Sequence, residues 1–141
     1  MYFLPKDKMD IDAVAHLESL SNEEIKPYLD ILLSWLQDLN WPVAISIAER
    51  LSRCGEEIVE PIKKVLATND SIWKYWVLSE VVINASPKVR EALFDDIARL
   101  IDHASDDEKI EEVDLAAKEV MELYNSDKEL HVQKLRTNTN S

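Results

Sequence analysis

Helix start signals recur along the whole chain, and neither an alternating strand pattern nor an Asn-Gly or Asp-Gly hairpin signal interrupts them. Residues 21–24 (SNEE) and 105–108 (SDDE) fit the capping box, in which a Ser hydroxyl and a Glu three residues later satisfy backbone N–H groups at a helix start. Three further starts carry a capping residue, and they are Asn40, Asp70 and Ser86. The sequence therefore predicts an all-α protein.

These signals divide the chain into predicted helices over residues 10–19, 22–37, 41–53, 57–67, 70–84, 87–103 and 107–124. Gly55 is expected to be the C′ residue that ends the helix over 41–53. Apolar periodicity stops after the last helix. We therefore expect residues 1–125 to form a single domain and residues 126–141 to form a frayed C-terminal tail.

An internal repeat relates the helices in pairs. Asp38, Asp70 and Asp107 each stand three residues before a large apolar side chain, and they are 32 and 37 residues apart. Repeats of this length, with two helices each, are typical of α-solenoids, whose units must stack to bury their apolar faces. We expect a short HEAT-like α-α superhelix of about three helix pairs with an N-terminal capping helix.

Three strings are distinctive, and the last two of them are rich in tryptophan: residues 4–8 (LPKDK), 35–44 (WLQDLNWPVA) and 72–76 (IWKYW). Together they resemble an uncharacterised bacterial family, the domain of unknown function 5071, over nearly the whole chain up to about Leu123. The resemblance implies a small HEAT-like helical fold from a bacterium of the Firmicute group. It implies no assigned activity, so no functional residues can be carried over.

The charge of the chain limits its partners. Asp and Glu number 28 against 16 Lys and Arg, a net charge of -12, and no basic cluster exceeds the pair Lys63-Lys64. Nucleic-acid binding, which depends on a basic surface, is not expected. Apolar runs such as Tyr75–Leu78 are too short for a membrane span, and the N-terminus lacks a secretory pattern, so we expect a cytoplasmic protein.

Residues that would support catalysis or metal binding are scarce. The single glycine, Gly55, excludes glycine-rich phosphate cradles and the nucleophile elbow. Cys54 is the only cysteine, and we expect it to be a packing residue. His16, His103 and His131 do not have metal-ligand spacing. The sequence predicts no enzyme activity, no cofactor and no metal.

The helix over 72–85 is apolar around almost its whole circumference, and one narrow strip differs. Trp73, Val77, Glu80 and Asn84 fall within about 60° of one another at helical spacing. Because the second helices of stacked pairs line the concave surface of a solenoid, this strip is predicted to face the groove. The alternative is that Glu80 pairs with Arg53 or another base and that Trp73 fills a gap.

Equivalent helices of the other repeats add polar side chains to this predicted groove, including Ser46. The predicted protein-binding residues are Trp41, Glu49, Arg53, Trp73, Glu80, Asn84, Glu111, Asp114 and Lys118. Residues 102–114 contain seven acids and one base, so half of the net charge lies there, either as a solvated loop or as a docking site. Aromatic anchors among charged side chains are typical of interface hot spots.

The preferred hypothesis is a non-enzymatic module that holds another protein with a basic surface, by analogy an immunity-type or regulatory protein. One alternative is an enzyme that resembles HEAT-like alkylpurine DNA glycosylases, with Trp73, Trp76 and either Asp70 or Glu80 at a damaged base. The missing basic rim argues against it. Another is a metabolite pocket lined by Trp41, Trp73 and Glu80. The sequence does not define the oligomeric state.

Overall fold

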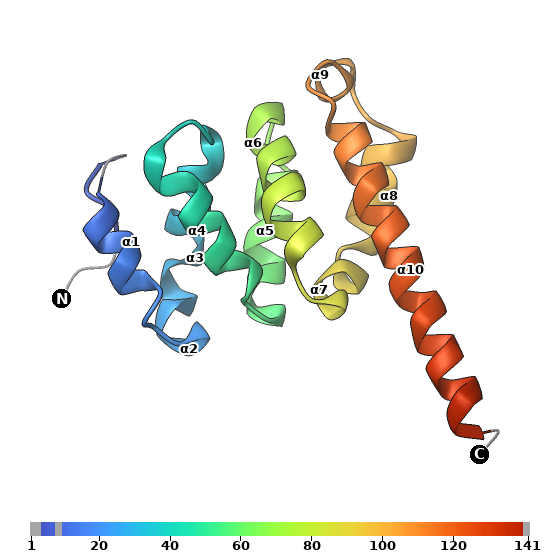
Figure 1. The fold of residues 1–141 in the computed structure, drawn as a ribbon. Helices are drawn as coiled ribbons and strands as arrows, with labels where there is room; N and C mark the ends of the chain where they lie inside the picture. The colour runs from blue at the N-terminus through green and yellow to red at the C-terminus, as the bar shows by residue number, and fades with distance from the viewer. Residues whose placement is uncertain (1–3, 8–9, 140–141) are drawn as a thin grey trace.

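The computed structural model describes residues 4–7 and 10–139, and these consist of helices and connecting turns with no strand among them (Figure 1). The predicted all-α class is therefore confirmed. The α-helices are α1 (Ile11–Leu17), α2 (Asn22–Ile25), α3 (Leu29–Ser34), α4 (Pro42–Ser52), α5 (Val59–Leu66), α6 (Ser71–Trp76), α7 (Pro87–Ala92), α8 (Phe94–Asp102), α9 (Asp106–Ile110) and α10 (Val113–Thr139). Short 3-10 or π turns extend several of them: η1 (Lys26–Tyr28), η2 (Trp35–Gln37), η3 (Glu56–Ile58), η4 (Val77–Val81) and η5 (Val82–Asn84).

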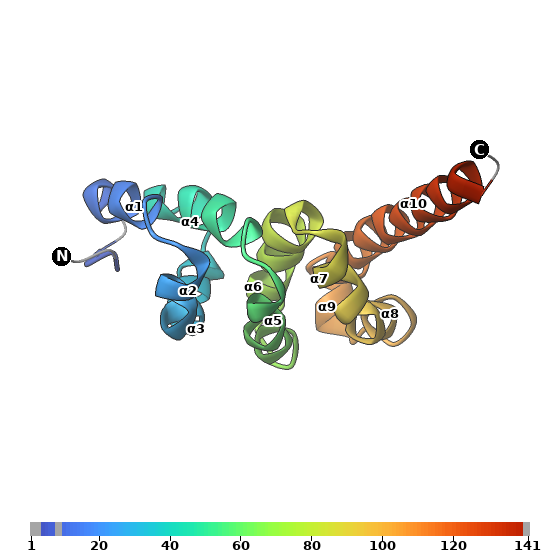
Figure 2. The same cartoon turned by 90° about the horizontal axis from the view of Figure 1, so that it is seen from below.

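The helices form two rows. A front row, nearest the viewer in Figure 1, contains α1, α4, α6 with its continuation η4, and α10; a back row contains α3, α5 and α8. Figure 2 shows the two rows as layers, seen from below. Leucine and isoleucine side chains such as Leu36, Ile47, Ile62, Leu78 and Leu100 are fully buried in the core. Burying each contributes about 1.5–3 kcal/mol, so the rows depend on each other for stability.

The predicted capping boxes are present. Ser21 Oγ accepts from Glu24 N at 3.1 Å, and Ser105 Oγ accepts from Glu108 N at the same distance. In return, each Glu side chain accepts a hydrogen bond from the backbone N–H of its Ser. Asp70 caps α6 in the same way, through a bond from Trp73 N at 3.0 Å. Local sequence alone accounts for these helix starts.

Two turns differ from prediction. At the start of α4 the N-cap position belongs to Trp41 instead of Asn40, and no side chain forms a capping hydrogen bond there. That helix ends at Ser52, and Gly55 adopts φ -86°, so it is not a left-handed C′ residue. Among the described residues, the left-handed conformation belongs instead to Glu112, with φ 61°, at the junction of α9 and α10.

The helix predicted over 70–84 is not regular. After Trp76 it widens into the π turn η4 and then tightens into the 3-10 turn η5. Because a π turn holds more residues than an α-helical turn, each extra residue shifts the following side chains by about 100° around the axis. Side-chain directions after Val77 therefore differ from those of an ideal helix.

The last helix continues well beyond its predicted end. Where the sequence analysis expects a frayed tail from residue 126, α10 remains helical to Thr139. No Gly or Pro follows Pro87, so nothing in the chain interrupts the helix, and the loss of apolar periodicity indicates only that this half has no core to face. Residues 140 and 141 of the predicted tail lie outside the described residues.

Arg90 links α10 to the end of the 3-10 turn η5. It is 4 % exposed, donates to Asp127 Oδ2 from Nε at 3.0 Å and from NH2 at 2.8 Å, and reaches Ala85 O from NH1 at 2.6 Å.

No helix in the described part of the chain is both long enough and apolar enough to span a membrane.

Candidate functional site

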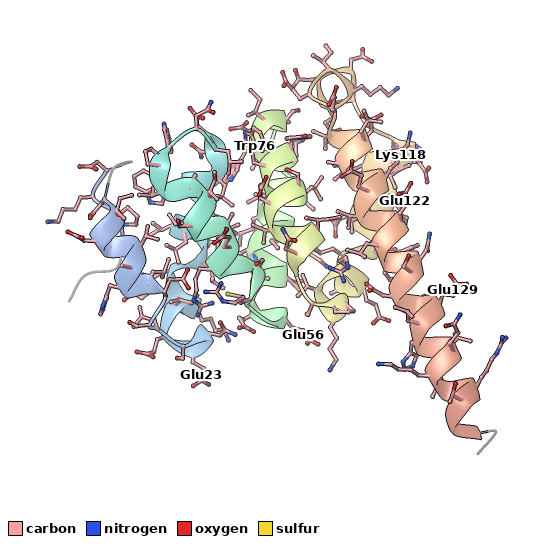
Figure 3. All side chains as sticks on the ribbon, in the orientation of Figure 1. Glu23, Glu56, Trp76, Lys118, Glu122 and Glu129 are labelled. Atoms are coloured by element: carbon pink, nitrogen blue, oxygen red, sulfur yellow. The ribbon has the colours of Figure 1, made fainter. Side chains whose placement is uncertain are left out.

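A pocket opens on the front row where α6 meets the turn between α9 and α10. Its volume is about 310 Å³, and we call it the Trp76 pocket after the side chain at the front of α6 (Figure 3). Its lining residues are Ile72, Tyr75, Trp76, Ile110, Glu111 and Glu112. The site combines apolar and aromatic side chains from one helix with two carboxylates from the neighbouring turn.

The apolar part of the pocket is open to solvent. Ile110 is 74 % exposed and Ile72 is 48 % exposed. Trp76 is half-buried, and its ring contacts that of Tyr75 edge-on at a centroid distance of 4.9 Å and an angle of 73°. This edge contact orients the indole ring, so a partner would meet a fixed aromatic surface with little side-chain entropy left to lose.

The residues of the predicted strip differ in burial. Glu80 follows Trp76 by four residues and is half-buried, whereas Val77, one member of the predicted strip, is completely buried. Asn84 is exposed, and its Nδ2 donates to Glu80 O at 3.1 Å. The predicted continuous strip is therefore broken, and Trp76 takes the place that the sequence analysis gave to Trp73.

Trp73 contacts the back row and is not part of the Trp76 pocket lining. Its Nε1 donates to Leu33 O at 2.9 Å, and its ring lines a 180 Å³ cavity with residues of the back-row helices α3 and α5 such as Leu33 and Val65. The indole thus fills a gap between helices and satisfies a backbone carbonyl. This geometry matches the alternative left open for Trp73, in which its ring fills a gap between helices.

The other predicted residues are dispersed. Trp41 is half-buried and packs edge-on against Trp35 at 5.5 Å, and Glu49 is exposed on α4. Arg53 forms an ion pair with Glu18, the residue after α1, and does not pair with Glu80. Its NH1 also donates to Glu49 O at 3.3 Å. These contacts hold Arg53 between α1 and α4.

On α10 the predicted residues also separate. Figure 3 places Lys118 on the side of α10 that is turned away from α6. Asp114 is half-buried and is not part of the pocket lining. Of the residues predicted for protein binding, Glu111 alone lines the Trp76 pocket.

A buried ion pair, which the sequence analysis missed, holds the turn that carries Glu111. Lys74 Nζ lies 2.9 Å from Glu108 Oε2, with side-chain exposures of 5 % and 4 %. Arg99 NH2 of α8 approaches the same oxygen at 3.5 Å. Lys74 is the only charged residue in the stretch 71–79, and a lone base in an apolar helix is the sequence signal for a buried acidic partner.

Glu108 has a structural role as a buried carboxylate that stays charged. Burial favours its neutral form, but the Ser105 backbone N–H and the Lys74 ammonium outweigh burial and lower the pKa of the carboxyl to about 2. Oε1 accepts from Ser105 N at 2.9 Å while Oε2 accepts from Lys74, so both oxygens are engaged. Ser71 Oγ adds a bond to Asp107 Oδ2 at 2.8 Å. Together these hydrogen bonds and ion pairs connect α6, α8 and α9, and so they position the Trp76 pocket.

A second cavity, of about 520 Å³, opens beside this ion pair and is lined by Ser71, Lys74, Arg99, Asp107 and Glu108, among others. Lys74 and Arg99 both contact Glu108, and Asp107 accepts a hydrogen bond from Ser71 Oγ. These contacts stabilise the junction of α6 with α9.

The remaining reactive groups do not form a site. Cys54 is 1 % exposed, and burial raises the pKa of its thiol to about 11. The thiol stays protonated near neutral pH and is a poor nucleophile. Within the described residues, no three His, Cys, Asp or Glu side chains are placed to hold a metal ion.

A search of the curated proteins finds no match to this chain. The model of a protein family matches residues 3–121, which covers the helices from α1 through the first third of α10 and includes every residue of the Trp76 pocket. The chain belongs to the family defined by the domain of unknown function DUF5071.

Proposed function

We propose that this protein is a non-enzymatic binding module that holds a basic segment of another protein on its front row. The observation that carries the proposal is the Trp76 pocket, where exposed Ile72 and Ile110 flank an oriented indole beside two carboxylates. Apolar and aromatic anchors can be desolvated by a partner, while the carboxylates at the rim favour lysine and arginine over acidic side chains.

Charge supports a basic partner. The segment 102–114 has a net charge of -6, and it includes the turn that forms one wall of the pocket. A negative field of this kind accelerates the encounter with a basic protein, and the aromatic anchor slows dissociation afterwards. The acidic segment is thus a docking site in this proposal, beyond its role as a solvated turn.

The architecture proposed with this function is a HEAT-type α-solenoid with its front row on the concave side. The helix pairs and the repeat spacings of 32 and 37 residues support it. A bacterial, cytoplasmic protein that neutralises or regulates a basic partner would have this size and charge. Immunity to a basic toxin is one such role, suggested by analogy of charge and size.

The test begins with capture of partners from the source cell by the full chain, followed by binding measurements with the purified partner. We expect Trp76→Ala to weaken binding about thirtyfold, the effect of losing a hot-spot side chain worth about 2 kcal/mol. Glu111→Lys should mainly slow association and reduce its dependence on salt.

The matched control is Glu56→Lys, which reverses an exposed charge at the lower edge of the molecule in Figure 3, whereas Trp76 lies near the upper edge. It changes the net charge by the same amount as Glu111→Lys but lies away from the pocket. If the two reversals slow association equally, net charge and not this site attracts the partner. Unchanged affinity in Trp76→Ala would reject the pocket as the binding site.

A further inference from the structure

The C-terminal half of α10 has no core of its own. From residue 125 to 137 every side chain except Asp127 is exposed, and this half extends beyond the two rows of helices (Figures 1 and 2). Isolated helices shorter than about 12–15 residues are marginal in water. The second half of α10 continues a helix whose first half packs on the body, but its exposed side chains add little stability, so a surface outside its own chain would stabilise it.

One side of α10 carries a stripe suited to that purpose. Glu119, Leu123, Leu130 and Lys134 are separated by four, seven and four residues, so they lie on one side of the helix. Leu130 is 59 % exposed, Leu123 is half-buried, and Glu119 and Lys134 are exposed without an ion-pair partner among the described residues. The stripe is acidic at its first end, apolar in the middle and basic at its last end.

This order of charges makes the stripe complementary to itself. We propose that two copies of the chain form a dimer in which their α10 helices pack antiparallel along it. Leu123 would then contact Leu130 of the partner subunit, and Glu119 would pair with Lys134 of the partner subunit. Both contacts are centred between residues 126 and 127, so one two-fold axis satisfies them together.

The shape of the molecule fits this arrangement. The helix rows lie beside the first half of α10, and the second half projects free of them (Figure 1). In an antiparallel pair each body lies beside the projecting half of the other α10, so the bodies do not compete for space. A parallel pair would place Glu119 against its own copy and would bring the two bodies together, which disfavours it.

Charge also favours a second copy of the chain as the partner that packs on the stripe of α10. Residues 128–136 contain three bases and one acid, in a chain of net charge -12, so the projecting half is attracted to acidic surfaces such as the first half of α10. The stripe uses no residue of the Trp76 pocket, so the proposal does not depend on the proposed function.

The mass of the full chain in solution tests the dimer. Light scattering after gel filtration, from about 1 to 500 µM, should show a concentration-dependent rise from 16.3 kDa toward twice that value. Leu130→Glu should raise the dissociation constant at least about tenfold. Ile31→Glu on α3, where the native side chain is 50 % exposed, is the matched control and should leave the dissociation constant unchanged.

Charge reversal tests the register. Glu119→Lys and Lys134→Glu should each weaken the dimer about tenfold, because each places like charges opposite each other twice. The double variant should restore the wild-type dissociation constant. Circular dichroism of each variant shows that the helices are retained. Failure of the double variant to recover would reject the antiparallel pairing.

Cross-linking tests the direction independently. Ser126→Cys lies beside the proposed two-fold axis and should form a disulfide with its own copy under mild oxidation, whereas Thr137→Cys should not, because antiparallel packing separates the two copies of residue 137 by about 30 Å. The native Cys54 is buried and does not compete. A monomer at every concentration, or equal cross-linking by both variants, would overturn the proposal.

Discussion

At the scale of single residues, Glu112 shows a conflict between side chain and backbone. Its φ of 61° lies in the left-handed region, which costs an L-residue about 1–2 kcal/mol and costs glycine almost nothing. The turn between α9 and α10 needs this conformation to reverse the chain. We expect Glu112→Gly to raise the free energy of unfolding by about 0.5–1 kcal/mol, measured by urea denaturation.

The neighbouring Glu111 provides the control because its φ is -88°, a conformation that any residue adopts. Glu111→Gly removes a carboxylate from the same turn and adds chain entropy to the unfolded state, so it should lower stability. Equal destabilisation by the two glycine variants would show that the turn stores no backbone strain at Glu112.

At the scale of elements, local sequence predicts helix starts well and side-chain directions less well. Ser21 and Ser105 cap as expected because a capping box depends on four adjacent residues only. The π turn after Trp76 has no such signal, since residues 77–81 (VLSEV) are compatible with a regular helix. Packing against α4 and α10 must select it, and that choice changes the directions of the side chains that follow Val77, including Glu80 and Asn84.

The link between α6 and α9 depends on a buried pair of opposite charges. Lys74→Met keeps an apolar stem of similar length but leaves Glu108 buried without its ammonium partner. We expect a loss of up to about 3–5 kcal/mol in the free energy of unfolding, measured by urea denaturation, because a buried charge that loses its nearest partner is strongly destabilising and Arg99, at 3.5 Å, keeps only the longer contact. The double variant Lys74→Met/Glu108→Gln removes both charges and should recover part of that loss. No recovery would mean that Lys74 acts through packing alone.

At the scale of the whole molecule, sequence predicts the all-α class but not which distant residues tie the helices to one another. Helix start signals and apolar patterning are sufficient for an all-α chain, whereas the repeat of stacked pairs stays a prediction. The ion pairs Lys74–Glu108 and Arg90–Asp127 join residues 34 and 37 positions apart, and nothing local specifies either partner. The length of α10 is also underestimated, because a helix without a core-facing stripe shows no periodicity to detect.

Acid stability of the whole molecule follows from one of these ion pairs. The pKa of Glu108 lies near 2 in the folded protein, below its ordinary value of 4.5, so between these pH values the unfolded chain binds one proton more at this group. Its stabilising contribution is complete above about pH 4.5 and is lost as the pH falls toward 2, at about 1.4 kcal/mol per pH unit. Glu108→Gln cannot titrate at this position. In urea unfolding between pH 2.5 and 5, its free energy of unfolding should therefore fall with decreasing pH less steeply than that of the wild type, by up to about 1.4 kcal/mol per pH unit. The many other carboxyl groups titrate in both proteins, so the difference between the two curves isolates Glu108. Parallel curves would mean that the carboxyl keeps its ordinary pKa, and the Lys74 contact would then contribute packing without charge stabilisation.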